Sequence, residues 1–128
     1  MKNIQAQMKE LFGNSCYAYC LAALFSKTAD IKTLTKYVLE GWYNVFIDDD
    51  GFVSKPLQYI KWICGETYKE VEHVPYVPSS EEQIVCWEYK DGTHFVIMKD
   101  NQVIFDPAGE SNTVKYGKIK NARKFIRR

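Results

Sequence analysis

The sequence predicts an α+β domain in which N-terminal helices pack on a C-terminal antiparallel sheet. Residues 16–25 form an uncharged run without Pro or Gly that is apolar on every side of a helix, which is typical of a buried central helix. Residues 67–106 are rich in β-branched and aromatic residues and are divided by turn-forming residues. Because the helical patterns come first and the strand patterns follow, we do not expect an alternating α/β arrangement.

Helical patterns occur three times in the first half of the chain. We expect helices over residues 16–26, 31–40 and 55–64. Ser15 precedes the first helix as an N-cap, and Asp30 precedes the second. Gly41 and Gly65 follow the second and third patterns, where glycine often ends a helix. The first helix is the most apolar and is therefore expected to be the central one.

Strand patterns fill the second half. They cover residues 67–77, 83–89, 94–99 and 103–106. Pro75 and Pro78 limit the first of them to the edge of a sheet, because proline cannot donate a hydrogen bond to a neighbouring strand. Short polar turns separate the other three, which predicts an antiparallel meander. The end of the chain, residues 116–128, fits either a last strand or a short helix.

Composition limits the class of protein. A chain of 128 residues suffices for one domain with one core, so we expect a single domain over residues 1–128. Hydrophobic residues make up 46% of the chain and aromatic residues 15%, which excludes a disordered, collagen-like or coiled-coil protein. No apolar run reaches the roughly 18 residues of a membrane span, and the N-terminus lacks the apolar segment of a secretion signal. We therefore expect a cytoplasmic protein with reduced cysteines.

The formal net charge of +1 hides an uneven distribution of charge. All 16 acidic residues precede residue 111, whereas seven of the 17 basic residues follow it. One interpretation is that this basic tail, residues 115–128, neutralises the acidic body of the domain. The other is that the tail binds an anionic cell-wall or membrane surface. We do not expect nucleic acid as a partner, because no nucleic-acid-binding motif accompanies the bases.

Cys16, His94 and Asp106 form the strongest candidate site. Cys16 lies at the start of the central helix, where unpaired backbone N–H groups and the helix dipole favour a thiolate. His94 opens a strand after a turn, and it would share the thiol proton and later protonate the leaving amine. Asp106 ends the neighbouring strand and would hold the imidazole in the required tautomer. This set of residues predicts acyl transfer by a cysteine nucleophile, a reaction that needs no cofactor.

The turn between the last two strands decides whether His94 and Asp106 meet. With a two-residue loop over residues 100–101, Asp106 would face away from His94. With a three-residue loop over residues 100–102, Val96 would pair with Asp106, and His94 and Asp106 would be diagonal neighbours on one face. We therefore predict the three-residue loop.

Two segments of the chain resemble the papain-like cysteine peptidases, and most of all the family that processes bacteriocins by removing double-glycine leaders. Cys16-Tyr-Ala-Tyr-Cys-Leu-Ala-Ala-Leu-Phe25 resembles the nucleophile helix of that family. His94-Phe-Val-Ile and Val103-Ile-Phe-Asp106-Pro107 resemble its histidine and Asp-Pro segments. The resemblance implies a minimal papain-like fold and a peptidase with a Cys16-His94-Asp106 triad. It further implies a substrate among the peptides of peptidoglycan, as for a phage endolysin released from the cytoplasm at lysis, or a double-glycine leader.

The chain departs from this family at two positions. Tyr17 follows the nucleophile where the family usually has Gly. Glu10 stands where the family has the Gln that stabilises the oxyanion, so we assign this role to Gln7, with Gln5 and Asn14 as further candidates. These departures favour, as an alternative, a non-catalytic binding or inhibitory module on the same fold. A transglutaminase-like acyl transferase would use the same triad and is a further alternative.

The other polar residues have simpler interpretations. Cys20, Cys64 and Cys86 lack the spacing of zinc ligands and are expected in the core, so we expect no metal. Residues 48–51 form an acidic turn rather than a calcium loop, because the flanking ligand positions hold apolar residues. His73 lies close to a proline in an edge segment and is expected to be structural or exposed.

Overall fold

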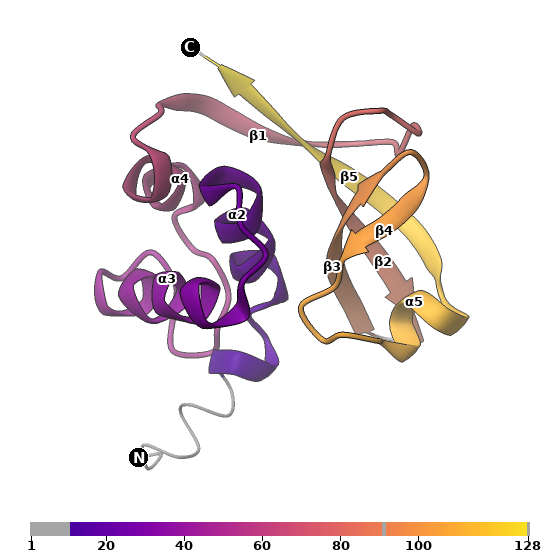
Figure 1. The fold of residues 1–128 in the computed structure, drawn as a ribbon, viewed down its shortest axis with the longest axis horizontal. Coiled ribbons are helices and arrows are strands. Elements are labelled where there is room, and N and C mark those ends of the chain that lie inside the picture. The colour runs from indigo at the N-terminus through magenta and orange to yellow at the C-terminus, as the bar shows by residue number, and fades with distance from the viewer. Residues whose placement is uncertain (1–10, 91, 128) are drawn as a thin grey trace.

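The computed structural model describes residues 11–90 and 92–127, and it confirms the α+β class. Helices in the first half of the described chain form one side of the molecule, and a five-stranded antiparallel sheet forms the other (Figure 1). The elements are, in order, α2 (Cys16–Ser26), α3 (Ile31–Tyr43), α4 (Pro56–Cys64), β1 (Tyr68–Val74), β2 (Gln83–Tyr89), β3 (Gly92–Lys99), β4 (Gln102–Phe105), α5 (Asn112–Tyr116) and β5 (Lys118–Arg127). Among the described helices, none is long and apolar enough to cross a membrane.

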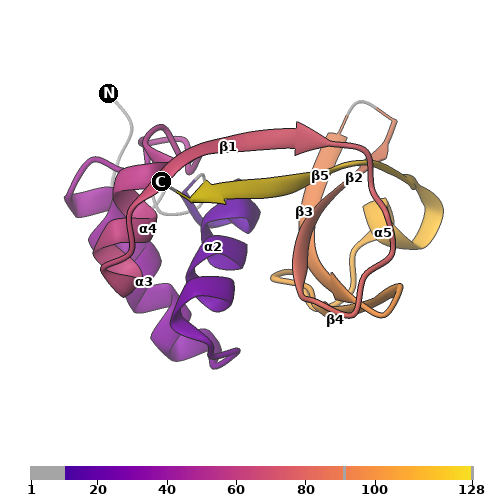
Figure 2. The same cartoon turned by 90° about the horizontal axis from the view of Figure 1, so that it is seen from above.

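The order of strands in the sheet is β1-β5-β2-β3-β4. β1 lies at one edge, as its prolines predict, and β2, β3 and β4 form the expected meander. The end of the chain is a strand, because β5 runs between β1 and β2 and pairs with both. In Figure 2, β1 and β5 run side by side from the curved part of the sheet to the helices. The last strand therefore connects the two sides of the molecule.

The sheet is apolar on both faces. Successive side chains of a strand point to opposite faces, so Ile84 joins the core between the sheet and the helices, whereas Val85 joins a second cluster on the other face. Val114 of α5 packs against this second cluster. α2 lies in the first core, where it packs against α3, α4 and β3. Its residues Ala18, Cys20, Leu21 and Ala22 are completely buried, which confirms α2 as the central helix.

Gly41 does not end the second helix, so this part of the prediction is wrong. α3 continues through Gly41 to Tyr43. A Cβ atom at Gly41 would lie 2.7 Å from Cε1 of Tyr59 and 2.8 Å from Cδ1 of Ile47. The glycine is therefore required for close packing against these two buried side chains, and not for a left-handed helix end. Gly65 does end α4, with a φ of 80°.

The basic residues near the C-terminus belong to the folded domain. Ala122 is completely buried, and the ring of Phe125 contacts that of Phe25 at a centroid distance of 5.1 Å. Arg127 lies 3.3 Å from Glu66, and Lys118 lies 3.7 Å from Glu88. Both pairs are solvent-exposed, so each stabilises the fold by no more than about 1 kcal/mol. Burial of apolar side chains, more than neutralisation of charge, thus holds this strand in place.

Candidate active site

The hairpin between β3 and β4 has a two-residue loop, so the predicted three-residue loop is wrong. Lys99 pairs with Gln102, which leaves Asp100 and Asn101 in the turn. Both have positive φ angles, 53° and 61°, as a type I′ turn requires. Asp and Asn tolerate this left-handed conformation better than most residues, which explains why the shorter loop forms.

A bulge in β4 restores the side-chain orientation that the loop alone would have reversed. Met98 pairs with Val103, but Ile97 pairs with Phe105, so Ile104 is an extra residue in β4. An extra residue moves every later side chain of its strand to the opposite face. Asp106, which follows β4 directly, is therefore on the same face as His94.

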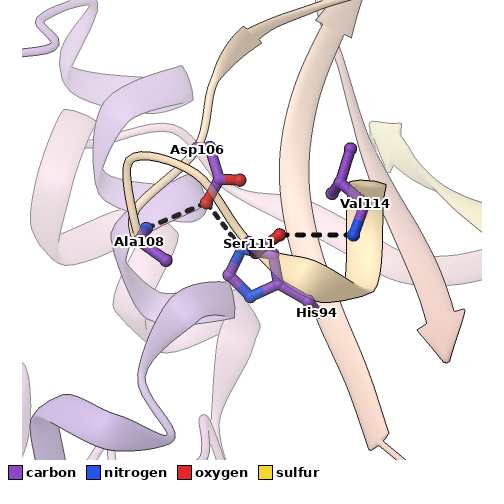
Figure 3. Close-up of polar contacts among 5 residues, drawn as sticks. All are labelled: His94, Asp106, Ala108, Ser111 and Val114. Carbon is purple, nitrogen blue, oxygen red and sulfur yellow. Dashed lines mark hydrogen bonds and ion pairs between the residues drawn. The ribbon is translucent and has the colours of Figure 1, made fainter. Parts of the chain in front are cut away.

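His94 and Asp106 are in direct contact (Figure 3). His94 Nε2 lies 2.6 Å from Asp106 Oδ1, and the two side chains are only 12% and 7% exposed. The backbone N–H of Ala108 donates a hydrogen bond to the same Oδ1 over 2.9 Å. This second donor fixes the carboxylate, which in turn fixes the imidazole ring. Because Asp106 occupies Nε2, Nδ1 is the ring nitrogen left for another partner.

Cys16 is that partner. It is the first residue of α2, its side chain is partly exposed, and it interacts with His94 strongly enough to raise the pKa of the imidazole. Ser15 is the N-cap residue, but its hydroxyl donates to the carbonyl oxygen of Phe12 over 3.2 Å and does not cap the helix. The structure thus brings together all three residues of the predicted triad. Cys16 thus lies at the N-terminus of α2, where the backbone N–H groups of the first turn have no partner within the helix.

The surroundings of His94 favour the imidazolium. Burial by itself lowers the pKa of His94, but hydrogen bonds to Cys16 and Asp106, and their negative charges, outweigh burial and raise this pKa to about 8. Cys20, one helical turn after Cys16, is completely buried. Burial raises the pKa of Cys20 well above its ordinary value, and the negative charges of Cys16 and Asp106 raise it further. Cys20 is therefore a neutral thiol of the core, as predicted.

Comparison with known proteins assigns the chain to a family without a known activity. Residues 1–127 match the family described as "Protein of unknown function, DUF261". The chain belongs to the DUF261 family. Neither a curated protein nor a solved structure matches it. The papain-like resemblance of this DUF261 chain therefore remains a prediction from its sequence.

Tyr17, which stands where the papain-like family has glycine, is accommodated between helix and sheet. Its ring packs on that of Phe95, with centroids 4.7 Å apart and an interplanar angle of 38°. Burial raises the pKa of Tyr17 to about 12, although the charge of Arg123 and its hydrogen bond to Tyr17 act in the opposite direction. In this DUF261 chain, the Tyr17 side chain thus packs between α2 and β3, although it is larger than the glycine of the papain-like family.

The oxyanion donor is not decided by the described residues. Gln5, Gln7 and Glu10 lie outside them, so the assignment of Gln7 remains a prediction. Asn14 is described and exposed, in a bend just before α2. The backbone N–H of Cys16 remains the expected second donor.

His73 and the acidic turn have the simpler roles that we predicted for them. Within residues 11–90 and 92–127, no three His, Cys, Asp or Glu side chains are arranged to hold a metal ion. His73 is exposed on β1, as predicted, and its pKa is lowered by burial and by the charges of Arg123 and Lys120. In the acidic turn, Asp48 Oδ1 accepts hydrogen bonds from the backbone N–H groups of Asp50 and Phe52, each over 3.0 Å. This carboxylate thus stabilises its own turn.

A groove elsewhere on the described part of the chain does not include the triad. It has a volume of about 980 Å³ and lies between the C-terminal half of α2 and the strands β1 and β5. Phe25, Tyr68 and Phe125 supply aromatic surface, and Arg123 lines it as well. Arg123 also contacts the ring of Tyr17, the residue next to Cys16.

We expect the free energy of unfolding to fall as the pH rises through the pKa of His94. This pKa is raised from 6.5 to about 8 in the folded chain, so the folded state binds the proton more tightly than the unfolded state. The resulting stabilisation is complete below pH 6.5 and is lost as the pH rises through about 8. It amounts to about 2 kcal/mol. Urea unfolding at about pH 6 and about pH 9 measures it. His94→Gln should remove this pH dependence and His73→Gln should retain it, whereas an unchanged dependence in His94→Gln would contradict the assignment.

Proposed function

We propose that this chain is a cysteine peptidase in which Cys16 is the nucleophile, His94 the acid and base, and Asp106 the residue that orients the imidazole. The observation that carries the proposal is the position of His94, which is bonded through Nε2 to Asp106 at 2.6 Å and whose pKa is raised by both Cys16 and Asp106. A histidine held between a carboxylate and a partly exposed thiol at a helix start is the arrangement that activates a cysteine. A cysteine and a histidine with merely structural roles would not need this chain of contacts.

The proposed reaction follows from these positions. The Cys16 thiolate attacks the carbonyl carbon of an amide, and the electron pair of the C=O bond moves to the oxygen. The backbone N–H of Cys16 donates to the oxyanion that forms, with Gln7 as the proposed second donor. When the C–N bond breaks, the His94 imidazolium protonates the leaving amine and a thioester remains on Cys16. His94 then removes a proton from water, which attacks the thioester and releases the acid and the thiolate.

Asp106 supports both halves of this reaction. Its carboxylate accepts the Nε2–H of His94, so the proton that is exchanged with substrate and water is carried at Nδ1. The ring cannot rotate away without breaking the bond to Asp106, which the N–H of Ala108 also holds. The same negative charge favours the imidazolium that forms during the attack. Asp106 therefore orients the acid and base without exchanging a proton itself.

The proposed substrate is a peptide amide. The peptide cross-links of peptidoglycan are the first candidate, which rests on the resemblance to small phage and bacterial peptidases and on the basic residues of the C-terminal strand. The side chains of Lys120 and Lys124 are exposed on β5 and are available to an anionic wall or membrane surface. A double-glycine leader is the second candidate. No cofactor takes part in the proposed reaction.

Alkylation with iodoacetamide, followed by mass spectrometry of the labelled peptides, tests the proposal. We expect Cys16 to be labelled selectively near neutral pH, and His94→Ala to abolish this selectivity because the imidazole no longer shares the thiol proton. Cys64 is an internal control, since it is also partly exposed but its Sγ donates to the carbonyl oxygen of Ile60 over 3.3 Å. His73→Ala is the matched histidine control and should label like the unmodified chain. Slow and equal labelling of all four thiols would refute the peptidase and favour the non-catalytic binding module.

A further inference from the structure

We infer that Arg123 is a positioning residue of the proposed site, which holds the helix that carries Cys16 against the strand that carries His94. The inference rests on the proposed function, because it concerns the distance between the thiol and the imidazole of that triad. Arg123 belongs to neither of these two elements, since it lies on β5. It acts through Tyr17 and Phe95, which directly follow the two triad residues in the sequence.

The contacts of Arg123 join these two aromatic residues. The guanidinium carbon lies 5.0 Å from the ring centroid of Phe95 and 5.9 Å from that of Tyr17. The guanidinium also interacts with the Tyr17 hydroxyl, whose pKa it lowers against the larger effect of burial. The two rings are themselves in contact, with centroids 4.7 Å apart. The three side chains thus form one cluster between α2 and β3, in which each member contacts the other two.

Arg123 is itself held by its own strand. Its Nη1 donates a hydrogen bond to Oδ1 of Asn121, and Asn121 pairs with Cys86 of β2. On the other side of β5, Arg123 is opposite His73 of β1. β5 is an interior strand and its backbone is paired on both sides, so the guanidinium is presented from a rigid element. The planar group, with several donors in fixed directions, suits the combined task of stacking and hydrogen bonding.

The cluster fixes a distance on which the proposed chemistry depends. The thiol is on α2 and the imidazole is on β3, and a displacement of about 1 Å between reacting groups costs up to about 100-fold in rate. The positive charge of Arg123 lies on this side of α2. It lowers the pKa of Cys86, whereas the charge of Cys16 raises the same pKa. The groups that interact electrostatically with Cys16 from the packed elements are Cys20, Cys86 and His94. Arg123 therefore acts on the thiol indirectly, through the positions of Tyr17 and Phe95.

The test is the rate of Cys16 alkylation by iodoacetamide as a function of pH. In the unmodified chain this rate measures the reactivity of the Cys16 thiol. We expect Arg123→Met to slow this reaction at least tenfold near pH 7 and to shift the pH profile towards that of an ordinary thiol, whose pKa is about 8.5. Arg123→Lys keeps the charge but not the planar group, and should restore part of the rate. Arg127→Met is the matched control, because Arg127 lies on the same strand and stacks on Tyr68.

The outcomes separate the inference from the proposed function. An unchanged pH profile in a folded Arg123→Met chain would overturn the inference alone, since a merely structural role would lower the melting temperature without altering the reactivity of the folded thiol. Absence of selective Cys16 labelling in the unmodified chain would overturn the proposed function and the inference with it. If Arg123→Met does not fold, Tyr17→Phe decides, because it removes only the hydroxyl that bonds the guanidinium. Tyr17→Phe should then slow the labelling in the same direction, and an unchanged rate would overturn the inference.

Discussion

Cys16→Ala is expected to abolish amide hydrolysis by this chain. Removal of the nucleophile of a catalytic triad lowers kcat by about 10⁶-fold, because the remaining groups have no atom that can form the covalent intermediate. The site favours this residue over the other thiols, since Cys16 is partly exposed and bonded to His94, whereas Cys20 is completely buried with a raised pKa. The measurement is the release of free amino groups from purified peptidoglycan, and cleavage of a synthetic peptide that carries a double-glycine leader.

The control for this experiment is another partly exposed cysteine. Cys64→Ala removes a thiol at the end of α4 that has no histidine among its contacts in the described residues, so hydrolysis should be retained. Equal activity in Cys16→Ala and the unmodified chain would contradict the proposed nucleophile. If Cys16 is labelled selectively but neither probe is cleaved, an amine acceptor added with a glutamine-containing peptide distinguishes the transglutaminase-like alternative by the formation of a new amide.

Truncation after Tyr116 is expected to unfold the domain. The deletion removes β5, which pairs with β1 on one side and with β2 on the other. It also removes the buried Ala122, and the ring of Phe125 that contacts Phe25 and Tyr68. A small domain is stable by only about 5–15 kcal/mol, and the loss of an interior strand exceeds this margin. Circular dichroism should show no cooperative thermal transition in the truncated chain.

A charge variant separates this structural role from binding of an anionic surface. Lys120→Gln with Lys124→Gln removes two exposed charges of β5 while leaving its apolar side chains intact, so the fold should be retained. If the strand also binds an anionic surface, this variant should bind purified cell walls more weakly, and the difference should disappear at high salt. A truncated chain that unfolds cooperatively like the intact one and loses only wall binding would contradict the structural role.

Local patterns in the sequence predicted most of the elements. The uncharged apolar run of residues 16–25 predicted a central helix, and α2 is completely buried at four of its positions. The prolines after residue 74 predicted an edge strand, and β1 lies at an edge. The end of α3 was mispredicted because a glycine can either end a helix or allow close packing within one. Only the packing of Tyr59 and Ile47 against Gly41 shows that the glycine allows close packing here. The sequence did not decide between a strand and a helix at the end of the chain, because the strands that pair with β5 are distant in the sequence.

The candidate site, like the fold, was predicted from the sequence only in part. The positions of Cys16, His94 and Asp106 in the predicted elements, together with the resemblance to papain-like peptidases, were enough to select these three residues. The face of the sheet to which Asp106 points could not be predicted in this way. The two-residue turn reverses this face, and the bulge at Ile104 reverses it again. Arg123 was missed because its role depends on contacts with Tyr17 and Phe95, which belong to other elements.

The sequence by itself determined the α+β class, the buried central helix and the three residues of the candidate triad, because these follow from periodicity and from the chemistry of individual side chains. Only the tertiary structure decided that β5 is an interior strand, that a bulge directs Asp106 towards His94, and that Arg123 contacts both Tyr17 and Phe95. Each of these depends on strand pairing or on contacts between residues far apart in the chain. Such contacts are set by how the whole chain packs, and no local pattern encodes them.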